Sequence, residues 1–408
     1  MSIFREIPPT AGFPLHIKDL LSPFFDKHRR LLEEDFKDYF NFSFSSTTYS
    51  GTAAFYFILE ALKRISSKKS VVIPAFICPL IPLAIARAGL KVIVCDIQKD
   101  NFNFDLIRLQ KLCTENTDIA AIVAVHLAGI PLNIDAIKEL IKDKEISIIE
   151  DCAQAQGATY HRQKVGTLGE FSFFSLCRGK GLTIYEGGIL ASKIQGYREL
   201  LKDTVFIFGK NNYFSEGLKI IELFGYWIFY RPLLFWFIFS FPQKFWEMLG
   251  NKEKAMIEYF DTNFPIHNVS KFRRAVGHSC FKEIEKKTLQ QRAIALRYIE
   301  KLGARGDIKI ITEPYDTQAS YPFLAIIFSN PEKCIAAKKE FNDSGLGASQ
   351  IYLSAITEYD YLKNIIEETP CPNAKLIAKN HITLSTSLFL TDRDINVITD
   401  KLISVLER

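Results

Sequence analysis

Short apolar runs alternate with amphipathic stretches through residues 45–192, and this alternation constrains the fold more than any other feature. The expected strands are 71–75, 91–95, 120–126, 146–150, 171–175 and 188–192, and the expected helices are 52–64, 79–88, 104–112 and 133–143. Apolar strands separated by helices of this length indicate a mainly parallel sheet with both faces covered. Ligands on such sheets bind beyond the carboxyl ends of the strands.

The remainder of the chain predicts a second, smaller unit. Residues 283–303 form one long amphipathic pattern that ends at Gly303, followed by expected strands 321–328 and 381–386 and expected helices 332–343 and 391–406. A chain of 408 residues is long enough for two domains. We predict a large domain over residues 1–280, with an aromatic-rich insertion at 215–255, and a small C-terminal domain over 281–408.

Composition excludes several classes of protein. At 48% hydrophobic and 24% charged residues the chain is globular. The net charge is only +5 and its lysines and arginines are scattered, which gives nucleic-acid binding no support. The eight cysteines include no CxxC pair, which favours free thiols in a reducing compartment and argues against a zinc or disulfide framework, and we predict no metal site. The N-terminus lacks the pattern of a secretory signal, so we expect a cytoplasmic protein.

An acidic residue and a lysine follow two of the expected strands. Asp151 stands at the end of the run 146–150, and Lys180 lies in a polar turn after the run 171–175. A lysine in such a place can bind the aldehyde of pyridoxal 5'-phosphate (PLP) covalently and later carry a proton. A carboxylate can keep the pyridine nitrogen of PLP protonated, so that the ring accepts electrons. Glu150 directly precedes Asp151 and His126 ends the expected strand 120–126, and we assign neither of them chemistry.

Several motifs around these two residues occur in an order that is typical of one family. They are Ser50-Gly51-Thr52-Ala53-Ala54, VVIPAF at 71–76, VAVHLAGIPLNIDAI at 123–137, Asp151-Cys152-Ala153-Gln154, Ser175 followed by Lys180, and Glu186-Gly187-Gly188. Together they resemble the motifs of the DegT/DnrJ/EryC1/StrS family of PLP-dependent aminotransferases, most of which act on sugars. The resemblance covers residues 5–200 well and 265–408 more loosely.

The resemblance implies a fold and a set of site residues. The fold would be the α/β architecture of fold type I, with a mainly parallel sheet in the large domain and a smaller α+β C-terminal domain. Lys180 and Asp151 would be catalytic. Gly51 and Thr52 would bind the phosphate at a helix N-terminus, where free N–H groups favour an anion, and Ser175 would add a hydroxyl. The residues in contact with the cofactor would be Gly51, Thr52, Phe76, Asp151, Gln154, Ser175, Lys180 and Asn268.

Two departures from the family pattern bear on the substrate. The family places an aromatic ring, which stacks on the cofactor, four residues after the proline of its VxPSFTF motif, and here that position is Cys78. Phe76 is the substitute we predict. The family also supplies an asparagine to the phosphate of the neighbouring subunit, and here Asn268 or Asn263 would take that role in a homodimer.

The predicted activity is transfer of an amino group from glutamate or glutamine to a keto-sugar, most often nucleotide-linked, in polysaccharide or glycosylated-metabolite biosynthesis. A dehydratase branch of the family has histidine in place of the lysine, and Lys180 argues against it. One alternative is PLP-dependent acyl transfer, or amination of a lipid-like substrate at the membrane. Another is a regulatory homologue that binds PLP without turnover.

Residues 223–249 break the pattern of the rest of the chain. The segment is apolar all round, holds all three tryptophans and has Arg231 as its only charge before Lys244. It is either an insertion buried against the protein or a contact with the inner face of a membrane. Because Arg231-Pro232 interrupts it, we expect two short helices lying in the interface, not one spanning helix.

Overall fold

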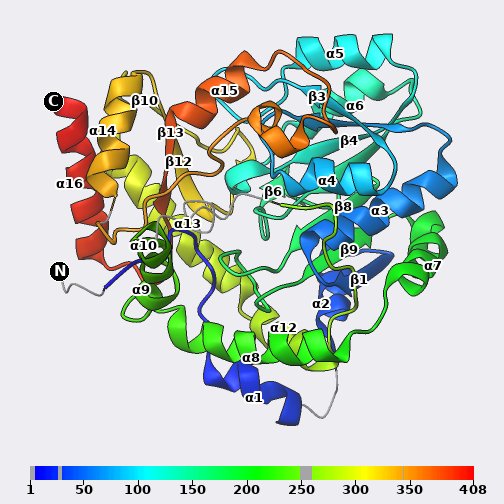
Figure 1. Cartoon of the computed structure of the whole chain (residues 1–408), viewed down its shortest axis with the longest axis horizontal. Helices are drawn as coiled ribbons and strands as arrows, with labels where there is room; N and C mark the ends of the chain where they lie inside the picture. The colour runs from blue at the N-terminus through cyan, green and yellow to red at the C-terminus, as the bar shows by residue number, and fades with distance from the viewer. Residues whose placement is uncertain (1–4, 26–29, 249–259, 343) are drawn as a thin grey trace.

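A mainly parallel seven-stranded sheet forms the centre of the computed structural model, which describes residues 5–25, 30–248, 260–342 and 344–408 (Figure 1). Its strand order is β1-β9-β8-β5-β4-β2-β3. The parallel strands are β2 (Ser70–Pro74), β3 (Lys91–Cys95), β4 (Ile119–Val125), β5 (Ser147–Asp151) and β8 (Phe171–Ser175). At one edge β9 (Gly188–Ser192) and β1 (Phe44–Thr48) pair antiparallel.

Helices cover both faces of this sheet, as the apolar strands predict. One face packs against α3 (Gly51–Ile65), α4 (Leu80–Arg87) and α7 (Arg198–Phe208). The other packs against α2 (Leu32–Phe40), α5 (Leu106–Glu115), α6 (Ile134–Ile141) and α12 (Lys271–Phe281). Alternate residues of one strand enter opposite cores: Val71 and Ile73 of β2 join the first, and Val72 joins the second.

A smaller antiparallel sheet follows α13 (Ile284–Leu302). It consists of β10 (Ile308–Ile310), β12 (Phe323–Phe328) and β13 (His381–Ser385), and its core is completed by α14 (Pro331–Phe341) and α16 (Asp392–Glu407). The short sheet of β6 (Thr159–Tyr160), β7 (Gln163–Lys164) and β11 (Thr317–Gln318) joins strands from both parts of the chain. The predicted α/β class with a smaller α+β unit is confirmed, while the boundary at residue 280, in the last turn of α12, stays a prediction.

The remaining elements connect these layers. They are α1 (Ile17–Phe25), α15 (Pro372–Lys379) and the short 3₁₀ turns η1 (Leu127–Gly129), η2 (Gln195–Tyr197), η3 (Ile356–Glu358) and η4 (Asp360–Leu362).

The described part of the aromatic-rich segment folds into three helices, not the two short helices expected, with a break at the expected place. α8 (Tyr213–Phe229) ends before Arg231-Pro232, and α9 (Phe235–Ile238) and α10 (Ser240–Met248) follow. Residues 249–255, the end of the predicted insertion, lie outside the described residues. Among the helices that are described, none combines the length and apolar character needed to cross a bilayer.

Candidate active site

The predicted catalytic residues lie at the carboxyl ends of two neighbouring parallel strands. In the register of β5 and β8, Asp151 is the Cα partner of Phe173, and Ser175 ends β8 two residues later. Lys180 follows in a turn that closes back on itself, because the Leu176 amide donates to the Gly187 carbonyl at 2.8 Å. The parallel sheet therefore brings Asp151 and the Lys180 turn to one edge.

Asp151 is a buried carboxylate whose negative charge is balanced only in part by neighbouring groups. Its side chain accepts one hydrogen bond, from the Ala153 amide at 2.9 Å. Burial raises its pKa to about 6, and the Ala153 N–H and the nearby Lys180 ammonium oppose this rise only in part. Among the ion pairs of the described residues, none involves Asp151. A cationic N–H donor, such as a protonated pyridine nitrogen, would offset the cost of burying this charge, so the residue fits the predicted cofactor.

The residues predicted to bind the phosphate, Gly51, Thr52 and Ser175, lie at or beside the N-terminus of α3, and we call them the phosphate cup. Ser50 caps the helix, with its Oγ accepting from the Ala53 amide at 3.1 Å. A Cβ on Gly51 would lie 3.2 Å from the Cβ of Ser175, and one on Gly188 would lie 2.3 Å from the Ser50 carbonyl oxygen. The two glycines therefore let α3, β8 and β9 approach closely. Thr52 lies in the first turn of α3, where unpaired N–H groups and the helix dipole favour an anion.

Gln154 forms a hydrogen bond within the protein, and Phe76 packs against other aromatic rings. The Gln154 Oε1 accepts from the Ala128 amide at 2.8 Å and steadies that residue in a left-handed conformation, with φ of 57°. Phe76 is 2% exposed and belongs to an aromatic cluster, with ring centroids 5.3 Å from Tyr352 and 5.9 Å from Phe102. Whether Phe76 stacks on the cofactor stays a prediction.

Asn268 binds to its own chain. Its side-chain amide donates to the Gly209 carbonyl at 2.8 Å and to the Asn211 Oδ1 at 3.0 Å, which holds the loop after α7. The neighbouring His267 ring lies 4.3 Å from the ring of Tyr49, two residues before Gly51. The segment is therefore near the phosphate cup within one chain, and the role of Asn268 toward a second subunit stays a prediction.

Two further residues near Asp151 were not predicted as site residues. Burial raises the pKa of the Cys78 thiol to about 11, with Lys180 opposing and Asp151 adding to the rise. Burial also raises the pKa of Tyr352 well above its ordinary value, and Cys78 and Asp151 add to that rise. Tyr352 reaches the site from an irregular part of the C-terminal region, between α14 and α15, where no local pattern marks it.

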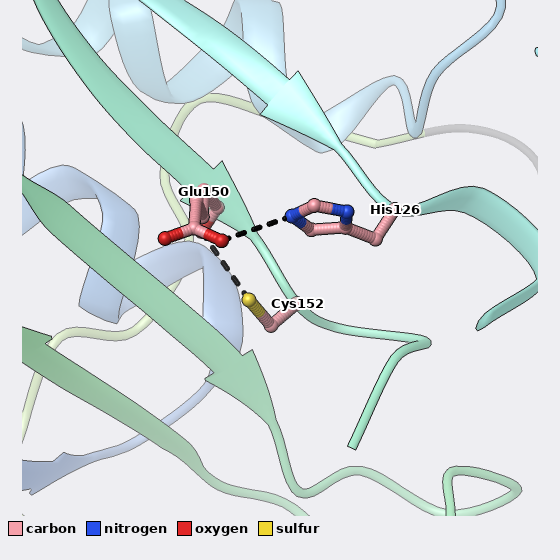
Figure 2. A group of neighbouring side chains, drawn as sticks. All are labelled: His126, Glu150 and Cys152. Atoms are coloured by element: carbon pink, nitrogen blue, oxygen red, sulfur yellow. Dashed lines mark hydrogen bonds and ion pairs between the residues drawn. The ribbon is translucent and has the colours of Figure 1, made fainter. Parts of the chain in front are cut away.

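His126, Glu150 and Cys152 form a buried cluster beneath the site (Figure 2). Because the Leu132 amide donates to Nδ1 of His126 at 3.0 Å, the ring proton sits on Nε2, which donates to the Glu150 carboxylate at 3.1 Å. That carboxylate also accepts N–H bonds from three backbone amides. The amides belong to Gly166, Leu168 and Gly169. The ligand atoms of these three residues lie close enough together to hold a metal ion. The imidazole and the carboxylate, however, already form hydrogen bonds with the protein. We therefore interpret the cluster as a support for the end of β5.

Comparison with known proteins identifies the family of this chain. The model of the DegT/DnrJ/EryC1/StrS aminotransferase family matches residues 25–203 and 248–403. GDP-perosamine synthase of Escherichia coli O157:H7 is 32% identical over 39% of this chain and 43% of its own length. The UDP-4-amino-4,6-dideoxy-N-acetyl-beta-L-altrosamine transaminase of Campylobacter jejuni is 25% identical over 80% of this chain and 76% of its own. The aminotransferase TlmJ of Streptoalloteichus hindustanus shares the fold, with a TM-score of 0.76 at 18% identity over 98% of this chain and 99% of its own. The chain thus belongs to the DegT/DnrJ/EryC1/StrS aminotransferase family and is a PLP-dependent aminotransferase.

Proposed function

We propose that this aminotransferase moves an amino group from glutamate or glutamine to a nucleotide-linked keto-sugar. The observation that carries the proposal is the placement of Lys180 beside the buried carboxylate of Asp151 at the carboxyl edge of the sheet. The similarity to GDP-perosamine synthase and to a UDP-sugar transaminase supports a nucleotide-linked acceptor. The glutamate or glutamine donor rests on the family resemblance.

Each site residue has a defined task in this proposal. When bound, PLP supplies an electron-accepting ring that acidifies the carbon next to the transferred nitrogen. Asp151 holds the proton at the pyridine nitrogen, because its buried carboxylate is stabilised by a positive partner. Lys180 moves a proton to and from the reacting carbon through its amine. The N–H groups of Gly51 and Thr52 and the hydroxyl of Ser175 bind the phosphate and fix the orientation of the ring.

Lys180 also separates this reaction from the dehydration carried out by another branch of the family. In that branch a histidine replaces the lysine, and the amine needed to carry a proton back during amino transfer is missing. The amine of Lys180 can carry that proton in both directions, which supports amino transfer to a keto-acceptor.

Two half-reactions test the proposal. Adding glutamate or glutamine to the yellow holoenzyme should bleach it and release the matching keto-acid, and a GDP- or UDP-linked keto-sugar should then restore the colour. An acyl-thioester with an amino acid serves as the control substrate for acyl transfer. No bleaching by either donor would overturn the amino-donor assignment. Turnover of the thioester without turnover of the keto-sugar would establish the acyl-transfer alternative.

We also propose a homodimer in which Asn268 acts on the phosphate site of the partner. Exposed apolar side chains on α7, Phe206 at 87% and Ile207 at 56%, lie just before the loop that Asn268 holds, and a second copy would cover them. Mixing Lys180→Ala and Asn268→Ala subunits tests this arrangement. If Asn268 acts across the interface, mixed dimers regain one complete site, and activity returns to about a quarter of the wild-type value. If it acts within its own chain, mixing restores nothing.

We place the enzyme in the cytoplasm, with residues 223–249 in contact with the inner face of the membrane. The eight cysteines are all free thiols. This supports a reducing compartment. The membrane contact rests on the surface of α8–α10.

A further inference from the structure

Helix α8 carries apolar side chains on the face that points away from the protein. Its inner face is formed by buried Glu216, Leu223 and Tyr226, spaced for one side of a helix. The opposite side exposes apolar residues at the same spacing. These are Phe214 (79% exposed), Leu218 (46%), Ile221 (67%) and Ile228 (42%). A helix of a soluble protein normally presents polar residues to water, so this outer apolar stripe indicates a surface that binds a partner.

The apolar surface continues over α9, α10 and α1. Its exposed members there are Ile17 (45%), Leu21 (40%), Phe24 (69%), Phe25 (76%), Leu233 (65%), Phe237 (47%), Ile238 (44%), Phe239 (44%) and Phe241 (48%). Figure 1 shows α1 and α8 along one edge of the molecule, with α9 and α10 beside the α8 C-terminal end. We call α1 together with α8–α10 the apolar face.

The protein holds this face firmly. Phe235 of α9 is only 5% exposed and packs into the core. The amide of Glu6 donates to the Pro232 carbonyl at 2.7 Å, and the Ser240 hydroxyl donates to the Glu6 carboxylate at 2.6 Å. These contacts fix α9 and α10 on the protein, so the exposed side chains of the apolar face are presented by ordered helices. The two stretches matched by the family model stop at residue 203 and resume at 248, so α8–α10 lie between them.

A cationic cavity opens within the apolar face, between the start of α1 and the end of α8. It has a volume of about 480 Å³ and is lined by His16, Ile17, Lys18, Trp227 and Arg231. Arg231 donates from Nε to the Trp227 carbonyl at 3.2 Å and from Nη2 to the Leu15 carbonyl at 3.3 Å, which holds its guanidinium at the cavity. Lys18 pairs with Glu283 at 2.9 Å and is 65% exposed. The cavity offers N–H donors and positive charge to an anion.

We propose that the apolar face docks on an anionic lipid membrane and that this cavity takes the phosphate of a lipid headgroup. Between Leu223 and Phe241 the sequence has Arg231 as its only charge, with tryptophan and tyrosine beside it, which is the composition that lipid interfaces favour. A second copy would bring the same cations, whereas an anionic surface complements them. The docking is independent of the proposed aminotransfer, because none of the site residues forms the face.

Docking would also orient the active site. Lys219, on the inner side of α8, pairs with Glu186 at 2.8 Å, and Glu186 lies in the same turn as Lys180. The buried guanidinium of Arg273 ties Glu216 of α8 to the Glu186 carbonyl. Helix α8 therefore joins the docking surface to the turn that carries Lys180. On a docked protein, this helix would fix the distance between the active site and the membrane.

Sedimentation with vesicles tests the proposal on the holoenzyme. Wild type should pellet with vesicles of phosphatidylcholine and phosphatidylglycerol, and more weakly with phosphatidylcholine alone. Changing Ile221, Ile228 and Leu233 to serine should weaken binding to the anionic vesicles by about tenfold or more, because three exposed aliphatic side chains no longer enter the lipid. The matched control changes three exposed aliphatic residues elsewhere, Ile107, Leu289 and Ile335, to serine, and should bind like wild type.

The cavity has its own test. Arg231→Gln should weaken binding to anionic vesicles about fivefold and leave binding to phosphatidylcholine unchanged, while the control Arg393→Gln on α16 should do neither. Inorganic phosphate at millimolar concentration should not displace wild type from vesicles if a lipid headgroup is the ligand. Tryptophan fluorescence of wild type should be quenched by lipids brominated in their acyl chains, a measurement that needs no variant.

Three results would overturn the proposal. They are wild type that stays in the supernatant with anionic vesicles, a serine triple variant that pellets as well as wild type, and tryptophan fluorescence insensitive to brominated lipid. Displacement by free phosphate would instead assign the cavity to a soluble anion. If wild type ignores vesicles and the triple variant runs as a smaller species in gel filtration, the face is an interface between copies of the chain.

Discussion

Replacing Asp151 with asparagine should weaken catalysis and strengthen the apoprotein at the same time. The asparagine Oδ1 can still accept the Ala153 amide, so the local backbone keeps its hydrogen bond. The amide cannot hold a positive charge at the pyridine nitrogen. We expect a loss in turnover on the order of 10³-fold, equivalent to about 4 kcal/mol in the barrier.

The effect on stability follows from the pKa of the carboxyl. Burial raises the pKa of Asp151 from its ordinary value of 3.8 to about 6 in the folded protein. The folded state therefore binds this proton more tightly than the unfolded state, and the protein loses stability as pH rises between these two values. The change corresponds to about 3 kcal/mol, which is lost in full above about pH 7. The asparagine variant lacks that loss, so its apoprotein should be up to about 3 kcal/mol more stable at neutral pH and within about 0.6 kcal/mol of wild type near pH 4.

Urea unfolding of the apoproteins at the two pH values, with turnover of the holoenzymes, checks both statements. The matched control is Asp96→Asn. Asp96 is 1% exposed, and its carboxylate accepts backbone N–H bonds from Ile97, Asn373 and Ala374, so that variant should lose stability. An Asp151→Asn apoprotein less stable than wild type at neutral pH would refute the reasoning about burial. Turnover within tenfold of wild type would mean that another group holds the ring nitrogen.

Three further predictions concern the same edge of the sheet. Lys180→Ala should abolish turnover, and borohydride reduction of the wild-type holoenzyme followed by peptide mapping should find the cofactor on Lys180; label on another lysine contradicts the assignment. Gly51→Ala should weaken PLP affinity at least about tenfold in a fluorescence titration, because its Cβ would stand 3.2 Å from that of Ser175 in the proposed phosphate cup; unchanged affinity would place the phosphate elsewhere. Glu150→Gln should lower the free energy of unfolding by about 3 kcal/mol, because an amide cannot accept the three backbone N–H bonds and the His126 bond together; a change within about 0.5 kcal/mol in urea unfolding would show that the cluster relaxes.

The strands and helices of the central sheet could be predicted because their signals are local. The expected strand 91–95 is β3 as observed, and the expected helix 283–303 is α13 (Ile284–Leu302) to within one residue at each end. In a parallel sheet the carboxyl ends of all strands meet at one edge, so the order of the motifs was enough to bring Asp151 and Lys180 together. The break in the aromatic segment at Arg231-Pro232 was predictable for the same reason, since proline lacks the N–H that a helix needs.

What the sequence could not show depends on contacts between distant segments. The antiparallel pairing of β1 with β9 joins residues almost 150 positions apart, such as Phe44 and Ser192, and neither strand carries a local mark of its direction. Tyr352 reaches Asp151 from an irregular segment for the same reason. The outward apolar stripe of α8 was also hidden, because a sequence that is apolar all round gives no sign of which side faces the protein.

The acidic pair at the end of β5 shows how one local signal divides into two roles. Adjacent residues of a strand point to opposite faces of the sheet, so Glu150 and Asp151 meet different surroundings. The Glu150 carboxylate is satisfied by three backbone amides and by Nε2 of His126. Asp151 accepts a single N–H, and its pKa rises to about 6 because burial disfavours its charge. The two carboxylates look alike in the sequence. Glu150 is fully hydrogen-bonded and supports the strand, whereas Asp151 has no fully compensating positive partner within the protein. It is the second kind, costly to the folded protein by itself, that a positively charged ring nitrogen can stabilise.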